Sequence, residues 1–315
     1  MEIPHWEDIL RAHTRISSLV HRTPVLTSSA INRIAGCEIF FKCENFQKAG
    51  AFKFRGATNA VLSLGEEEVK NGVATHSSGN HAAALALAAR SRGAKAYIVM
   101  PENAPSIKKE AVFSYGGEIT FCEATLEARE SALNRVVSET GATFIHPYNN
   151  FNVICGQATA AKELLEETGR LDLVMVPVGG GGLLSGTALS VKSMYPKTLV
   201  IAAEPENADD AFRSFKTGRL QPPLKPNTLA DGLLTALGPL TFKIIMENVD
   251  DILLAGEEGI VNAMKLIWER MKIIVEPSSA VPLAAILENR SQISAGRIGI
   301  ILTGGNVDLA KLPFK

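Results

Sequence analysis

The sequence predicts an α/β protein whose parallel sheets are covered by helices on both faces. Short apolar runs rich in β-branched residues alternate with longer segments that carry apolar residues at helical spacing. Such alternation is typical of strand–helix–strand units, which build parallel sheets. Several of the runs also end in glycine-containing turns, and α/β sheets bind ligands at the carboxyl ends of their strands.

Seven strands are expected, at residues 38–42, 72–75, 96–100, 118–121, 173–178, 199–203 and 297–302. The segments HAAALALAARSRG (81–93) and VNAMKLIWERMK (261–272) predict helices. A charged run at 65–70 and a polar turn at 147–150 are the candidate points where the chain crosses between domains. We therefore expect a large domain from residues 1–70 and 150–315 and a small mobile domain from residues 71–149.

The composition is that of an ordinary globular protein close to neutral charge. The chain has 315 residues, 46% of them hydrophobic and 21% charged, and a formal net charge of −1. This balance does not favour nucleic acid as a partner. The four cysteines show no CxxC spacing, so neither a structural zinc site nor a disulfide scaffold is expected. The acidic start MEIPHWED lacks the pattern of a signal peptide, and no segment reads as a membrane span, so we expect a cytoplasmic protein.

The segment LVMVPVGGGGLLSG (173–186) gives the strongest local signal. An apolar run leads into Gly179, Gly180, Gly181 and Gly182 and then into a helical pattern. Glycines let backbone N–H groups approach an anion closely, and the start of a helix favours negative charge. The segment has neither the GxxxxGK[ST] pattern of a P-loop nor the GxGxxG pattern of dinucleotide-binding folds. A phosphate cradle and a tight strand–helix turn both remain open.

Lys53 lies between Phe52 and Phe54 in AGAFKFRGATNA (49–60). Apolar surroundings disfavour the charged form of a lysine, which lowers its pKa and makes the amine a usable nucleophile. Alone, the motif is more typical of a lysine whose stem covers an apolar surface. Together with a phosphate cradle, however, such an amine meets the needs of pyridoxal phosphate, whose phosphate is anchored and whose aldehyde forms a Schiff base.

Two further turns could supply polar groups to the same strand ends. In THSSGNHAAA (75–84), Ser77 or Ser78 could cap a helix whose free N–H groups receive a carboxylate, and Asn80 could donate to a ring oxygen. In RIGIILTGGNVDL (297–309), a threonine hydroxyl would stand at the end of a strand. A simple turn with nothing bound is the alternative in both cases.

The acidic turn AAEPENADD (202–210) could supply hard oxygen ligands to Mg²⁺ or Ca²⁺. Most acidic turns are only solvated, so the segment is a weak signal by itself.

Taken together, the motifs resemble those of the serine racemase and serine/threonine dehydratase family, which are fold-type-II pyridoxal phosphate enzymes. AGAFKFRGATNA, THSSGNHA, EPSSAVPLA and TGGNVDLAKLP occur in the family's order over nearly the whole chain, and they are most similar to the β-hydroxyaspartate dehydratases. The resemblance implies a tryptophan synthase β-like fold, with two doubly wound parallel-sheet domains and the active site in the cleft between them. It also implies a homodimer that acts on a small amino acid.

The resemblance implies a role for each matching residue. The implied cofactor-binding residues are Phe52 under the ring, Lys53 on the aldehyde, Asn80 on the phenolic oxygen, Gly179, Gly180, Gly181, Gly182 and the amide of Leu183 on the phosphate, and Thr303 beside the pyridine nitrogen. The implied substrate-binding residues are Ser77, Ser78, Gly79, Asn80 and His81, with Arg129 as the candidate for a second carboxylate or, equally, part of a solvated helix face. Glu204, the carbonyl of Ala208 and Asp210 match the family's site for Mg²⁺, Ca²⁺ or Mn²⁺.

The implied activity is elimination of water from a 3-hydroxy amino acid (3-hydroxyaspartate, L-serine or L-threonine) to give a 2-oxo acid and ammonia, with Lys53 as the base. Racemisation at the same site is the alternative, because Ser78 falls where the family's racemases place a serine opposite the lysine. A β-replacement enzyme is less favoured. So is a non-catalytic phosphate-binding protein, because Lys53, Asn80 and Thr303 are all intact.

Overall fold

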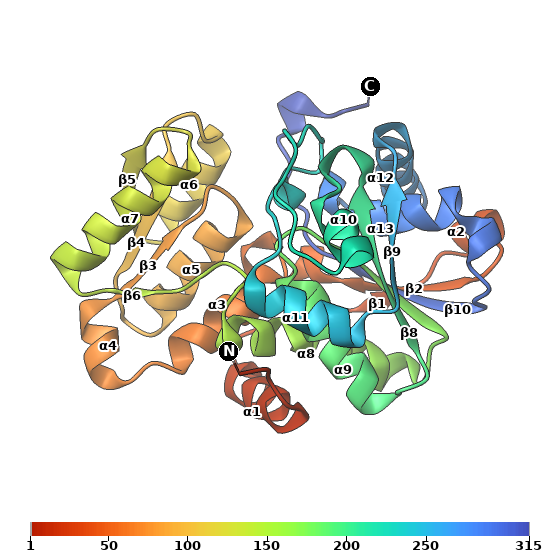
Figure 1. The fold of residues 1–315 in the computed structure, drawn as a ribbon, viewed down its shortest axis with the longest axis horizontal. Coiled ribbons are helices and arrows are strands. Elements are labelled where there is room, and N and C mark those ends of the chain that lie inside the picture. The colour runs from red at the N-terminus through yellow and green to blue at the C-terminus, as the bar shows by residue number, and fades with distance from the viewer. Residues whose placement is uncertain (1, 315) are drawn as a thin grey trace.

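A computed structural model, which describes residues 2–314, shows two sheets surrounded by helices (Figure 1). The larger sheet has the strand order β1-β2-β10-β7-β8-β9. Its strands are β1 (Val25–Leu26), β2 (Glu38–Cys43), β7 (Leu173–Pro177), β8 (Leu199–Pro205), β9 (Asp251–Ala255) and β10 (Arg297–Leu302). The short β1 is antiparallel to β2, and the other neighbours pair in parallel. The predicted α/β class with parallel sheets is confirmed.

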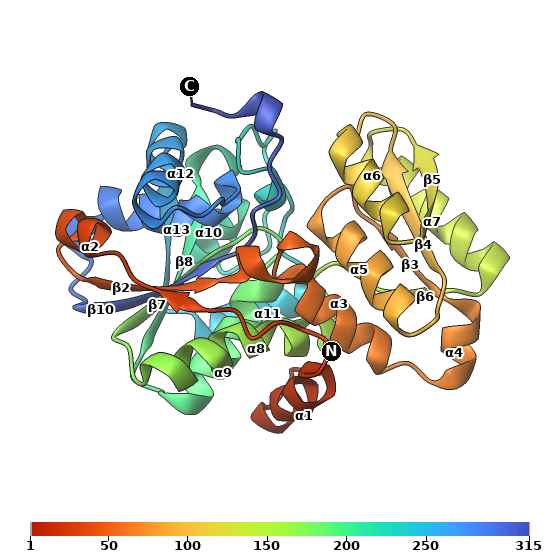
Figure 2. The same cartoon turned by 180° about the vertical axis from the view of Figure 1, so that it is seen from behind.

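The smaller sheet has the order β5-β4-β3-β6, and all of its strands pair in parallel. They are β3 (Val73–His76), β4 (Ala96–Pro101), β5 (Gly117–Cys122) and β6 (Thr143–Phe144). With α5 (Asn80–Ser91), α6 (Ser106–Ser114) and α7 (Leu126–Thr140) they form a lobe beside the larger sheet, as the front and back views show (Figures 1 and 2). All four strands come from the stretch expected to form the small domain, whose limits at residues 71 and 149 stay a prediction.

The helices are α1 (Trp6–Ile16), α2 (Ser29–Ala35), α3 (Lys53–Leu62), α4 (Glu66–Asn71), α5 (Asn80–Ser91), α6 (Ser106–Ser114), α7 (Leu126–Thr140), α8 (Phe151–Thr168), α9 (Gly182–Met194), α10 (Asp210–Thr217), α11 (Pro239–Asn248), α12 (Glu257–Met271) and α13 (Pro277–Glu288). Within residues 2–314, no helix is both long enough and apolar enough to cross a membrane. The sequence analysis missed β1 and β6, which have two residues each, and the edge strand β9.

Helix α3 lies unusually close to α8 because glycines face each other at the contact. A Cβ atom on Gly156 would stand 2.5 Å from the carbonyl oxygen of Arg55, and one on Gly56 would stand 2.8 Å from the carbonyl oxygen of Val153. Real Cβ atoms do not approach other atoms this closely, so the contact requires glycine on both helices. This packing fixes the helix that begins with Lys53 against the body of the larger sheet.

Candidate active site

The turn that ends at Lys53 is fastened to the carboxyl end of β10. Ala49 and Gly50 have left-handed φ angles of 56° and 67°, and the chain then runs extended into α3. The backbone N–H of Phe52 donates to the carbonyl oxygen of Thr303 at 2.9 Å. The lysine motif and the TGGN motif, which are far apart in sequence, therefore meet at the end of one strand.

The amine of Lys53 has the properties expected of a nucleophile. Its Nζ donates to the carbonyl oxygen of Pro147 at 3.1 Å and lies 5.2 Å from the ring centroid of Phe52. Burial lowers its pKa to about 8, and the nearby Glu276 carboxyl opposes that shift. A larger fraction of this amine is therefore uncharged at neutral pH than for a lysine in water.

The glycine loop 179–182 joins β7 to α9 and has no room for side chains. A Cβ atom on Gly180 would stand 2.3 Å from the ring of Tyr148, and one on Gly182 would stand 2.9 Å from Tyr148 Cβ. Gly181 has a φ of 84° and provides no side-chain cap to α9. The first-turn N–H groups of α9 therefore have no side-chain partner, which fits a phosphate group.

Thr303 lies in a small hydroxyl cluster beside this loop. Its Oγ1 is 2.9 Å from Oγ of Ser279, which in turn donates to the carbonyl oxygen of Gly304 at 2.7 Å and accepts from its N–H at 2.8 Å. Both hydroxyl groups are buried. The sequence analysis predicted the threonine but not the serine that orients it.

The start of α5 differs from the prediction that Ser77 or Ser78 caps it. The helix begins at Asn80, its N-cap is Gly79, and no side chain caps it. Ser77 Oγ accepts only from the N–H of Gly79, at 3.4 Å. The prediction was wrong because the helix begins beyond the reach of both serines. The N–H groups of Asn80 and His81 are thus left for a ligand, and the half-buried Ser78 precedes them in the chain.

Asn80 is held by two residues that the sequence analysis did not select. Its Nδ2 donates to both carboxyl oxygens of Glu276, at 2.9 and 3.1 Å, and its Oδ1 accepts from Nδ2 of Asn306 at 3.0 Å. Burial and the charge of Asp231 raise the pKa of Glu276 to about 7. Because a carboxylate can only accept, Glu276 fixes the orientation of the Asn80 amide and leaves its second N–H free.

The crossing segment 145–149 runs through the middle of these groups. Its carbonyl oxygens accept from Lys53 Nζ at 3.1 Å and lie 3.4 Å from Nε2 of His81. The ring of Tyr148 covers Gly180. Burial lowers the pKa of His81 well below its usual value, so this residue is neutral. The sequence analysis treated the segment only as a domain crossing, since its contribution is backbone oxygen and an aromatic ring.

Arg129 lies half-buried on α7, where its Nε donates to the carbonyl oxygen of Thr125 at 3.2 Å. Its charge adds to burial in lowering the pKa of His76 at the end of β3, and it opposes the burial that raises the pKa of Tyr148. Arg129 precedes the buried residues Ala132 and Leu133 by about one helical turn, so it shares the face of α7 that packs on β3.

Two carboxyl groups come together where β8 ends and α10 begins. Glu204 accepts from the N–H groups of Ala211 and Phe212 at 2.9 and 2.7 Å, whereas both oxygens of Asp210 are buried without a hydrogen-bond partner. Burial raises the pKa of Glu204 to about 8 and that of Asp210 to about 6. Ala208 ends the turn between them. Buried carboxyl groups that form no ion pair fit a cation, although no three His, Cys, Asp or Glu side chains of the described chain gather as a metal site.

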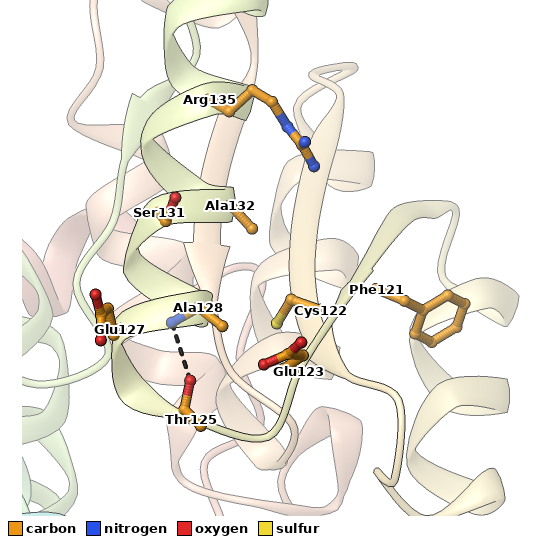
Figure 3. A pocket seen from close by; sticks show the side chains of 9 residues that line it. All are labelled: Phe121, Cys122, Glu123, Thr125, Glu127, Ala128, Ser131, Ala132 and Arg135. Carbon is orange, nitrogen blue, oxygen red and sulfur yellow. Dashed lines mark hydrogen bonds between the residues drawn. The ribbon is translucent and has the colours of Figure 1, made fainter.

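A separate surface pocket of about 500 Å³ lies between β5 and α7 (Figure 3). Cys122 and Arg135 line it, together with Thr125, whose Oγ1 accepts from the N–H of Ala128 and caps α7. None of the site residues predicted from the sequence lines this pocket.

Residues 16–304 match the family described as pyridoxal-phosphate dependent enzyme. The chain belongs to this family. Over 314 residues it is 53% identical to a β-hydroxyaspartate dehydratase of Paracoccus denitrificans, and the match covers 100% of both chains. It is 54% identical over 310 residues to a serine racemase of Dictyostelium discoideum, covering 97% of this chain and 96% of that protein.

Solved structures give the same result. The crystal structure of the Dictyostelium serine racemase matches with a TM-score of 0.93 over 97% of this chain and 99% of that chain. Maize serine racemase, at 48% identity, matches with a TM-score of 0.96 over 98% of this chain and 95% of that one. The family membership and the fold-type-II architecture implied by the sequence motifs are confirmed.

Proposed function

We propose that the protein is a pyridoxal phosphate-dependent ammonia-lyase that removes water from a 3-hydroxy amino acid to give a 2-oxo acid and ammonia. 3-Hydroxyaspartate, L-serine and L-threonine are the candidate substrates. The observation that carries the proposal is that Lys53, with its lowered pKa, contacts the same short segment, 145–149, as the uncapped glycine loop and the uncapped start of α5. The relatives that are about half identical to the chain are named as dehydratase and as racemase.

The residues of the candidate site match the polar groups of the cofactor one by one. The N–H groups of residues 179–183 would hold the phosphate, the free N–H of Asn80 would donate to the phenolic oxygen, and Thr303 would stand at the pyridine nitrogen. Phe52 would lie against the ring. When bound, the cofactor supplies an electron sink for charge that develops at the substrate Cα.

The chain's own residues would then hold the substrate and move its protons. The free N–H groups at the start of α5, with Ser77 and His81, would hold the α-carboxylate. Lys53 would take the Cα proton as general base, since an amine with a pKa of about 8 is a good acceptor near neutral pH. If Ser78 returns a proton to the opposite face, the same site racemises its substrate, which is the second candidate function.

Proton NMR in D₂O, with the holoenzyme and each candidate substrate in turn, tests the proposal. Formation of a 2-oxo acid is expected, and the fastest substrate identifies the preferred one. Deuterium at Cα of an intact amino acid, together with the opposite enantiomer, would favour the racemase. Lys53→Ala should lose both turnover and the absorption of the bound cofactor. Retention of either would contradict the assignment.

Arg129 is the residue we propose for the second carboxylate of 3-hydroxyaspartate. Arg129 shares the face of α7 that packs on β3, and serine lacks the carboxylate that Arg129 would bind. Arg129→Met should therefore lower kcat/KM for 3-hydroxyaspartate by at least about tenfold more than for L-serine, which is the effect of losing a charged hydrogen bond. Equal losses for the two substrates would contradict this role.

We further propose that Glu204, the carbonyl of Ala208 and Asp210 hold a divalent cation. The buried, unpartnered oxygens of Asp210 support this assignment. The homodimer implied by the resemblance is part of the proposal, and light scattering of the purified holoenzyme tests it by the mass in solution.

A further inference from the structure

An ion pair joins the two lobes beside the predicted active site. Nζ of Lys108, on α6, contacts a carboxyl oxygen of Asp231, in the turn Asp231–Leu233. The two residues belong to different lobes, because α6 packs on β5 of the smaller sheet while the turn lies over the glycine loop of the larger one. A Cβ atom on Gly179 would stand 2.9 Å from Cα of Leu233.

The ammonium group of Lys108 lies at the start of α5. A Cβ atom placed on Gly79, the N-cap of that helix, would stand 4.0 Å from Lys108 Nζ. Two kinds of donor therefore converge on the same space, namely the ammonium group and the uncapped N–H groups of the helix. Both favour an anion.

Asp231, which pairs with Lys108 in this structure, can be displaced by another anion. The side chain of Lys108 is 20% exposed and that of Asp231 is 50% exposed, and an ion pair with one solvated member contributes little net free energy. The other carboxyl group nearby, Glu276, already accepts two hydrogen bonds from Asn80. Lys108 is therefore free to exchange Asp231 for an incoming carboxylate.

We propose that Lys108 binds the α-carboxylate of the substrate at the start of α5, and that Asp231 is the anion that holds Lys108 while the site is empty. The inference rests on the proposed function, because it assumes an amino-acid substrate. It adds a binding residue from α6, an element that carries none of the recognised motifs.

The test compares KM in variants of the two members of the ion pair, because the proposal predicts a rise in KM for a Lys108 variant and no rise for an Asp231 variant. Lys108→Met should raise KM for the preferred substrate by about tenfold or more, because a charged hydrogen bond is lost, with a smaller change in kcat. Lys108→Arg, which keeps the charge, should restore most of the affinity. Asp231→Asn removes the competing anion, so KM should fall or stay within a factor of two or so of the wild-type value. Lys109→Met is the matched control, since this neighbouring half-buried lysine donates to the carbonyl oxygen of Glu102, away from Asp231, and should leave KM unchanged.

If the ion pair between Lys108 and Asp231 only holds the two lobes together, a different result is expected. In that case Lys108→Met and Asp231→Asn would both raise KM, and the proposal would be overturned. Gly79→Ala provides a second test that keeps the ion pair, because its methyl group would fill the space in front of Lys108 and should also raise KM. An unchanged KM in Gly79→Ala would likewise count against the proposal.

The binding step can also be followed without turnover. Titration of the holoenzyme with glycine, which has the α-carboxylate but no leaving group, is read from the absorption of the bound cofactor and should show the same order of affinities. If the wild-type protein binds no cofactor or converts no substrate, the proposed function fails. If the wild type is active but the two variants change KM in the same direction, only the role of Lys108 fails.

Discussion

Replacing Arg55 tests how the structure holds the helix that carries Lys53. The guanidinium group makes two paired contacts, to the two oxygens of Glu44 at 2.8 Å each and to the two oxygens of Glu163 at 2.8 Å each. Lys42 Nζ also donates to Glu163, at 2.7 Å. The four side chains are 0–3% exposed, and their two positive and two negative charges cancel.

Arg55→Met leaves two buried carboxylates facing one ammonium group, so one negative charge loses its compensation. Removing one partner from a buried ion pair costs about 3–5 kcal/mol, and we expect the free energy of unfolding to fall by that amount in urea titrations. Arg22→Met is the matched control. Its contact with Glu166, at 3.1 Å, has exposed fractions of 54% and 35%, so its loss should cost less than about 1 kcal/mol.

A double variant separates charge balance from lost packing. Glu163→Gln alone leaves one excess positive charge, whereas Arg55→Met with Glu163→Gln leaves Lys42 and Glu44, whose charges cancel. The double variant should therefore lose about 1–3 kcal/mol less than the sum of the single losses. Strictly additive losses, or a loss of less than about 1 kcal/mol in Arg55→Met, would refute the reasoning.

Three further predictions concern the site itself. Gly180→Ala would place a methyl group 2.3 Å from the ring of Tyr148, so the affinity for pyridoxal phosphate should fall by at least about tenfold in absorption titrations, while Gly65→Ala, with its nearest neighbour at 3.5 Å, should leave it unchanged. Glu276 has its pKa raised from 4.5 to about 7, so the folded state binds its proton more tightly and the free energy of unfolding falls as pH rises through that range. Glu276→Gln should remove this part of the pH dependence of unfolding, and an unchanged slope would show that Glu276 does not titrate there. Asp210→Asn should abolish the rise in melting temperature that Mg²⁺ is expected to give over EDTA in the wild type, and an equal rise in both proteins would contradict the cation site.

Much of the fold and of the cofactor cradle could be predicted because the signals are local. Strands such as Arg297–Leu302 are continuous apolar runs, and the turns after them contain the glycines that a close backbone approach requires. Lys53 and Thr303 were recognised in the same way, each from the motif around it. The start of α5 was misjudged because a serine near a helix start is a frequent cap, whereas here Gly79 takes that position.

The missed residues act through partners far away in the sequence. Asn80 and Glu276 are 196 residues apart, Lys108 and Asp231 are 123 apart, and the ion pairs of Arg55 reach 108 residues along the chain. No periodicity or motif in a single sequence encodes such pairs, since only the packing of separate elements brings them together. From the sequence alone, a charged residue such as Arg55 is therefore expected at the surface, although the fold buries it.

The crossing segment 145–149 contacts residues of the candidate site from both lobes. Its carbonyl oxygens face His81 and Lys53, and the ring of its Tyr148 lies on the glycine loop. The turn holds its shape through Nδ1 of His146, which accepts from the N–H groups of Tyr148 and Asn149 at 3.3 and 3.0 Å. Burial, followed by the neighbouring positive groups, lowers the pKa of His146 to about 4, so Nδ1 stays an acceptor at neutral pH. An unprotonated Nδ1 of His146 thus maintains the two hydrogen bonds that shape the turn in contact with Lys53 and Gly180.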